Sequence, residues 1–142
     1  MTNTNNKNNP IDDLINDFQL FDGWEERYSY LIELGNRLPP FDPLHMNDAY
    51  FVPGCISKVW MVPSFSDDNV LTFTATSNGD ITKGMIYILY LAYNGLRKDA
   101  IQDVDISGIF EALGLQQHIT AQRRNGFYAM VERIKSYGEA GD

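Results

Sequence analysis

The sequence predicts a single α+β domain in which a small antiparallel β-sheet is covered by helices. Two segments with helical periodicity come first, two short alternating segments follow, and three more helical segments complete the chain. Strands grouped apart from helices in this way are typical of α+β folds. The length of 142 residues suits one domain with one core. We expect an Asn-rich disordered leader over residues 1–10, the folded domain over 11–138 and a flexible tail over 139–142.

The first two predicted helices each carry apolar residues on one side. In the earlier one, over residues 11–21, these recur at i, i+3, i+4 and i+7. They are Ile11, Leu14, Ile15 and Phe18. The second helix covers residues 24–38, and Pro39 and Pro40 end it because neither can donate the next backbone hydrogen bond. We expect a loop over residues 41–47.

Two strands are predicted over residues 58–64 and 70–77. The second alternates apolar residues with threonines, which indicates one buried face. The polar residues Asp67, Asp68 and Asn69 between the strands suit a hairpin turn. A short extended segment over residues 49–52 is a candidate for a third strand.

The segment 80–94 is apolar on nearly all sides, which predicts a central, buried helix. We expect Gly95 to close it as a left-handed cap. Asp105 is the predicted cap of a short helix that ends at Gly114, and Thr120 is the predicted cap of the last helix. The buried stripe of that last helix consists of Phe127, Met130, Val131 and Ile134.

Charge and composition exclude several classes of protein. The net charge of −8 argues against nucleic acid or an anionic membrane as the main partner, because phosphate binding needs clustered lysines and arginines. One cysteine and two histidines are too few for a typical structural zinc site, so we expect neither metal nor cofactor. The longest apolar run, over residues 85–93, is too short to span a bilayer. We expect a cytoplasmic protein.

Cys55 is the first candidate for chemistry. Pro53 and Gly54 before it predict a tight turn, which places the thiol on a loop at the entrance to a strand. A lone cysteine is more often a small buried hydrophobic residue than a reactive group. The turn alone does not decide between these two interpretations.

Four segments form motifs in a fixed order: 24–39 (WEERYSYLIELGNRLP), 52–60 (VPGCISKVW), 81–85 (ITKGM) and 113–130 (LGLQQHITAQRRNGFYAM). Together they resemble the SufE family. They are similar to its opening signature, its G-C-x-S-x-V-W sulfur-acceptor motif, its helix start after the second strand, and its closing L-x-x-H-L-(S/T)-x-x-R-x-x-G-L-x-x-M. One departure is that Asn78 stands where the family commonly has an acidic residue.

The resemblance implies that Cys55 accepts persulfide sulfur from a SufS-type cysteine desulfurase. The sulfur would then pass to iron–sulfur cluster assembly on a Suf-type scaffold complex, and the desulfurase would be stimulated. The chain would be a sulfur-transfer accessory protein that does not turn over alone. We expect apolar neighbours, with Val52 and Ile56 as candidates, to shield the sulfur.

Other residues are supporting candidates by motif position. Lys58 and Arg123 are candidates for favouring the thiolate. Arg123 alternatively forms a salt bridge or anchors a loop, His118 is a packing or capping residue, and Glu111 is a solvated surface residue. Any role of Asn78 is left open by its departure from the family pattern.

Two other functions remain open from the sequence. One is a regulator that docks on the desulfurase without carrying sulfur. The other is a cysteine hydrolase that uses Cys55 and His118, although no orienting Asn or Asp is evident. A scaffold for an iron–sulfur cluster is disfavoured because one thiol is too few for ordinary ligation.

Overall fold

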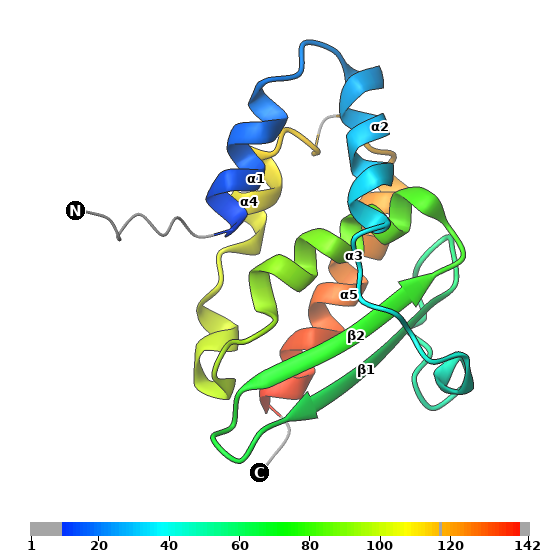
Figure 1. Cartoon of the computed structure of the whole chain (residues 1–142), viewed down its shortest axis with the longest axis vertical. Coiled ribbons are helices and arrows are strands. Elements are labelled where there is room, and N and C mark those ends of the chain that lie inside the picture. The colour runs from blue at the N-terminus through cyan, green and yellow to red at the C-terminus, as the bar shows by residue number, and fades with distance from the viewer. Residues whose placement is uncertain (1–9, 117, 140–142) are drawn as a thin grey trace, which may run out of the picture.

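The structure is a computed structural model that describes residues 10–116 and 118–139 (Figure 1). Its elements follow in the order α1 (Pro10–Gln19), α2 (Trp24–Gly35), η2 (Pro43–His45), β1 (Val59–Phe65), β2 (Leu71–Ser77), α3 (Asp80–Tyr93), η3 (Lys98–Asp103), α4 (Ile106–Ala112) and α5 (Ala121–Glu139). The predicted α+β class is confirmed. The predicted leader and tail fall largely outside the described residues, although Pro10 is the first residue of α1 and Glu139 the last of α5.

Strands β1 and β2 form an antiparallel hairpin in which Val59 lies opposite Ser77 and Phe65 opposite Leu71. Both strands are present, each beginning one residue later than predicted, and β1 also ends one residue later. The alternation in β2 is confirmed, since Leu71, Phe73 and Ala75 are buried between threonines that are not. Asn69 in the turn has a φ of 61°, a conformation that asparagine tolerates better than most residues.

The candidate third strand over residues 49–52 does not form, and the sheet of the described residues has the two strands β1 and β2. Phe51 and Trp60 form only an isolated antiparallel bridge. Two backbone hydrogen bonds accompany it, from Met61 N–H to Tyr50 O and from Val52 N–H to Val59 O, both 2.9 Å long. The pairing stops there because the chain turns away at Gly54, which has a positive φ of 97°.

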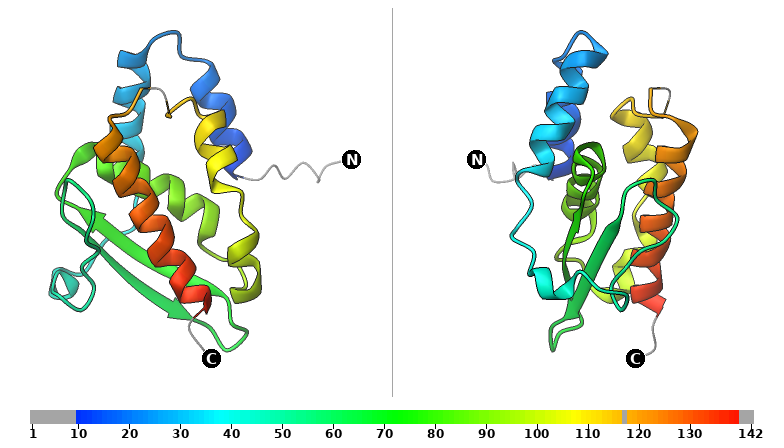
Figure 2. Two further views of the ribbon diagram at one scale, coloured as in Figure 1. Left: turned by 180° about the vertical axis from the view of Figure 1, so that it is seen from behind. Right: turned by 90° about the vertical axis from the view of Figure 1, so that its right-hand side faces the viewer.

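Helix α3 is the central element, as predicted. It packs against α2, α5 and α1 and against strand β2, so that α2 and α5 lie on opposite sides of it (Figures 1 and 2). An all-round apolar surface is stable only in such a position. Gly95 has the positive φ expected of a left-handed residue, 90°, but its N–H donates to Leu71 O of β2 at 2.7 Å. It therefore ties the end of α3 to the hairpin.

Helix α2 ends at Gly35. The two prolines had led us to predict an end at Leu38, which is three residues too late. Its last turn tightens into i to i+3 hydrogen bonds, from Asn36 N–H to Glu33 O and from Arg37 N–H to Leu34 O, both 3.0 Å. The predicted caps are confirmed, because Asp105 accepts from Gly108 N–H at 3.1 Å and Thr120 Oγ1 accepts from Arg123 N–H at 3.2 Å.

The 3₁₀ turns η2 and η3 lie in stretches for which the sequence predicted no regular structure. Their short i to i+3 turns carry no apolar periodicity that a sequence pattern would reveal. Within residues 10–116 and 118–139, no helix combines the length and the apolar character needed to cross a bilayer.

Candidate functional site

Cys55 lies on a loop, over residues 53–58, that enters β1. The hydrogen bond from Val52 N–H to Val59 O closes this loop at its base. Gly54 has a φ of 97°, which glycine adopts without steric cost. A Cβ at Gly54 would lie 3.1 Å from Ala129 Cβ, so the loop rests directly on α5.

The thiol itself meets α5 at Gly126. Cys55 Sγ–H donates to Gly126 O across 3.4 Å, and the Cys55 side chain is half-buried. A Cβ at Gly126 would stand 3.2 Å from Cys55 Cα and 3.4 Å from Sγ. Glycine at this position therefore permits the close approach of loop and helix.

A small hollow of about 10 Å³ lies beside the thiol. Its lining comes from the loop, from the first turns of α3 and from α5, and consists of Cys55, Ile56, Thr82, Met85, Arg123, Gly126 and Met130. Met85 and Met130 are buried, whereas Ile56 is 58% exposed. The hollow beside the thiol is thus lined by buried methionines from two helices and by one exposed apolar side chain, Ile56.

Burial raises the pKa of the Cys55 thiol above its ordinary value. The physical cause is loss of water around the thiolate, which disfavours the charged form. A nearby cation would act in the opposite direction, and Lys58 and Arg123 were expected to do so. In the isolated chain the effect of burial prevails, and the resting group at neutral pH is the thiol.

The far end of the loop is fastened to the end of β2. Asn78 Oδ1 accepts from Lys58 N–H at 3.0 Å, and Asn78 N–H donates to Lys58 O at 3.3 Å. The Ser57 side chain occupies the space that a Cβ on Gly79 would need. Asn78 therefore anchors the cysteine loop, and its amide oxygen accepts as a carboxylate oxygen would in the family pattern.

Arg123 is the one candidate cation that lines the hollow. Its backbone N–H bonds to the cap residue Thr120, but its guanidinium makes no ion pair or hydrogen bond with the residues that the structure describes. The expected salt bridge is therefore absent from this part of the chain. Arg123 is placed beside Cys55 only as one of the residues that line the same hollow.

Two further candidates lie away from the hollow. His118 stacks on Trp24 with ring centroids 4.1 Å apart, and its carbonyl accepts from the Tyr28 hydroxyl at 3.2 Å. Glu111 is exposed on α4, where its carbonyl accepts from Gly114 N–H at 2.9 Å. Neither residue lines the hollow beside Cys55. These positions agree with packing for His118 and solvation for Glu111.

Four residues of the hollow had not been singled out for chemistry: Thr82, Met85, Gly126 and Met130. Met130 was expected in the buried stripe of the last helix, and Met85 in the apolar central helix. Val52, a predicted shield, is buried but does not line the hollow, whereas Ile56 does. All four lie in the motif segments 81–85 and 113–130, but nothing in those segments indicated that they meet beside Cys55.

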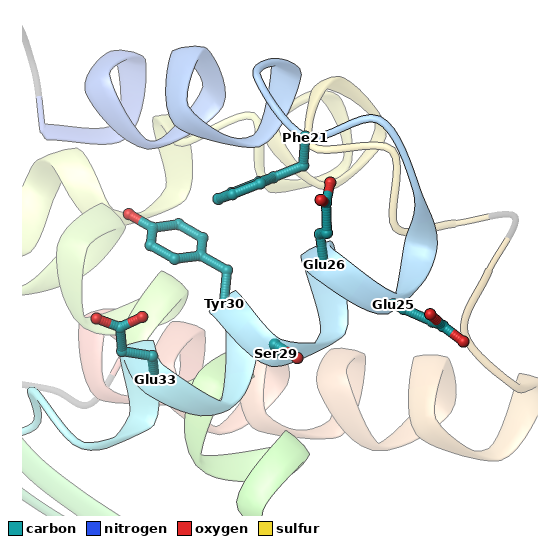
Figure 3. A pocket seen from close by; sticks show the side chains of 6 residues that line it. All are labelled: Phe21, Glu25, Glu26, Ser29, Tyr30 and Glu33. Carbon is teal, nitrogen blue, oxygen red and sulfur yellow. The ribbon is translucent and has the colours of Figure 1, made fainter.

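A larger hollow of about 450 Å³ lies on α2 (Figure 3). Its lining consists of Phe21, Glu25, Glu26, Ser29, Tyr30 and Glu33. It shares no residue with the hollow at Cys55 and contains no thiol or imidazole. Among the described residues, no group of three or more His, Cys, Asp or Glu side chains is arranged to hold a metal ion.

Comparison with known proteins shows which family the chain resembles. Residues 12–138 match the family described as SufE, Fe-S metabolism associated domain. A SufE-like protein of Rhizobium meliloti is 38% identical over 132 residues, which cover 91% of this chain and 94% of that protein. A SufE-like protein of Rhizobium etli is 36% identical over 128 residues, which cover 88% and 86%.

The solution structure of a hypothetical protein from Thermus thermophilus has the same fold. The two superpose with a TM-score of 0.70 at 18% identity, over 91% of this chain and 93% of that one. The fold is thus shared where most side chains differ, and the sequence match extends through the cysteine loop and both helices that line the hollow. The chain belongs to the SufE family of proteins associated with iron–sulfur metabolism.

Proposed function

We propose that Cys55 accepts the terminal sulfur of a persulfide on a SufS-type cysteine desulfurase. The sulfur then passes to a Suf-type scaffold complex in the cytoplasm, and its removal stimulates the desulfurase. The observation that carries this proposal is a half-buried thiol that faces a hollow of about 10 Å³ on a hydrogen-bonded loop. A persulfide needs access for transfer and cover against small thiols between transfers, and this position supplies both.

The chemistry is thiol exchange. The Cys55 thiolate attacks the outer sulfur of the donor persulfide, the donor S–S bond breaks, and the donor cysteine leaves as a thiolate that takes up the proton. Because burial raises the pKa of Cys55, the resting chain holds little thiolate. Contact with the desulfurase must supply a cation or a more open loop, and Arg123, which lines the hollow, is the candidate cation from this chain. A protein of this kind does not turn over alone.

The test incubates the chain with a SufS-type desulfurase and cysteine and records its intact mass. The expected result is added sulfur on Cys55 that a reductant removes, together with faster sulfide or alanine production. Cys55→Ser is expected to carry no sulfur and to lose the stimulation, while keeping its fold by circular dichroism.

Two outcomes would replace the proposal. If Cys55→Ser still stimulates the desulfurase fully, the chain is a docking regulator that carries nothing. If the chain alone hydrolyses a peptide or an ester in a Cys55-dependent manner, it is a hydrolase; the distance of His118 from the hollow speaks against this.

A further inference from the structure

The hollow beside Cys55 has a volume that bears on how much sulfur the chain can hold. It measures about 10 Å³, which corresponds to roughly one water-sized sphere. Cys55 is one of the residues that line this space, and its Sγ contacts Gly126, another lining residue, so a sulfur bonded to Sγ would have this hollow beside it. This argument rests on the proposed function, because it concerns the cargo of the same thiol.

The walls of the hollow cannot easily retreat. Met85 on α3 is 1% exposed and Met130 on α5 is 0% exposed, so both are held from behind by the core. On a third side, the backbone oxygen of Gly126 lies 3.4 Å from Sγ, and Thr82 is also buried. Protein interiors pack closely and resist the insertion of extra atoms.

The transfer reaction can in principle repeat. In the first step, Cys55–SH and R–S–SH give Cys55–S–SH and R–SH, with one S–S bond formed and one broken. A second donor persulfide would react with Cys55–S–SH to give Cys55–S–S–SH and another R–SH. Each step needs no external oxidant or reductant and lengthens the chain by one S–S bond of about 2.05 Å.

We propose that this hollow limits Cys55 to one carried sulfur atom, with Met85 and Met130 as the residues that set the limit. One added sulfur fills the available space. A second must displace a buried methionine or point past Ile56 into water, where small thiols remove it by exchange. The chain delivers sulfur in single units, and longer polysulfides are excluded by size.

The experiment counts sulfur atoms by intact mass after loading. One sample is loaded by a SufS-type desulfurase with excess cysteine, and a second is loaded with sodium polysulfide, which needs no partner. The wild-type chain is expected to retain one added sulfur in both samples. Met85→Ala and Met130→Ala are expected to raise the fraction with two or more sulfurs about tenfold, the factor that corresponds to about 1.4 kcal/mol.

Met61→Ala is the matched control, because Met61 is equally buried in β1 but does not line the hollow. It should retain one sulfur. Ile56→Ala separates cover from size, because Ile56 lines the same hollow but is exposed, so its truncation leaves the core packing intact. A longer sulfur chain would still meet water there, so this variant should retain one sulfur and lose it faster to added glutathione. Circular dichroism checks the fold of the two methionine variants.

The size limit is wrong if the wild-type chain holds two or more sulfurs as readily as Met130→Ala, or if Met61→Ala shows the same rise. Failure of the proposed function looks different. In that case the desulfurase adds no sulfur to any variant, while the polysulfide sample still reports how many atoms the hollow holds.

Discussion

The thiol of Cys55 has to satisfy two conflicting requirements. Cover by Met85 and Met130 protects a bound sulfur, but the same cover disfavours the thiolate that attacks the donor. A free thiolate in water would react faster and also lose its sulfur faster. The observed compromise is a half-buried thiol beside a hollow whose lining includes one cationic residue, Arg123.

This conflict predicts the pH dependence of Cys55 alkylation. Because burial raises the pKa in the folded chain, the rate with iodoacetamide should reach its midpoint at a higher pH in the native protein than in the urea-unfolded protein. Intact mass spectrometry of samples quenched at fixed times measures the alkylation rate at each pH. The signal comes from Cys55 alone, since the chain has no other cysteine. A native midpoint equal to or below that of the unfolded chain would show that Arg123 or Lys58 outweighs burial.

The sequence indicated some residues of this site and not others. Cys55 stood out because a turn and a motif surround it. Met85 and Met130 also lie in motif segments, but each fits an ordinary core residue of its own helix, so their place beside the thiol was not predicted. Their meeting at one hollow depends on how α3 and α5 are packed around the loop, and that arrangement is not encoded in local periodicity.

At the scale of elements, the contact between α2 and α3 is made at Gly84. A Cβ there would lie 2.8 Å from the Leu31 carbonyl carbon, which is backbone and cannot swing aside. The two helices can therefore approach only because this position lacks a side chain. The start of α3, with Thr82 and Met85 at the hollow, is fixed by this contact.

Gly84→Ala should lower the free energy of unfolding by about 1–3 kcal/mol through overpacking, despite the higher helix propensity of alanine. Gly23→Ala is the matched control, because nothing lies within 4 Å of a Cβ at that position. Urea denaturation of both variants measures the difference. Equal stability of the two variants would mean that the helices can slide apart at no cost.

Elements whose signals are local were predictable, and those that depend on distant partners were not. Asp105 and Thr120 cap their helices through bonds to residues three positions ahead, so a short pattern suffices. The segment at residues 49–52 has a strand-like composition. Its pairing with β1 is cut to one bridge by the turn at Pro53 and Gly54, which serves the cysteine loop.

At the scale of the whole molecule, the core contains an unusual polar group in Tyr93. Its side chain is fully buried in α3, and its hydroxyl has no hydrogen-bond partner among the described residues. Burial, followed by the charge of Glu132 and by Tyr128, raises the pKa of Tyr93 to about 12. The protonated phenol is thus strongly preferred in the folded state.

The sign of this shift predicts the alkaline limit of stability. A folded-state pKa above the unfolded value contributes stability that is complete below the unfolded pKa and is lost as pH rises through about 12. Tyr93→Phe should be at least as stable at pH 7, since no buried hydroxyl is left unpaired. In strong alkali it should exceed the wild type by about 2 kcal/mol.

Urea unfolding at pH 7 and in strong alkali measures both effects. Tyr87→Phe, on the half-exposed side of the same helix, is the control for loss of a tyrosine. A Tyr93→Phe chain that is clearly less stable at neutral pH would reveal a hydrogen bond to the hydroxyl.

The fold class was predictable from the order of the patterns, because helices grouped around a hairpin leave few arrangements that bury every apolar face. The central position of α3 followed from its all-round apolar surface. The site was predictable only as one residue on one loop. Its depth, its walls and the depressed acidity of its thiol are properties of the assembled core.

The hydrogen bond between Val52 N–H and Val59 O has a consequence for motion. Together with the Asn78 anchor, it makes residues 53–58 a closed ring whose base belongs to the rigid hairpin. Such a ring can open at the Cys55–Gly126 bond without breaking the strand ladder. Loop opening and global unfolding therefore cross separate barriers. The loop can open rapidly while the barrier to unfolding stays high.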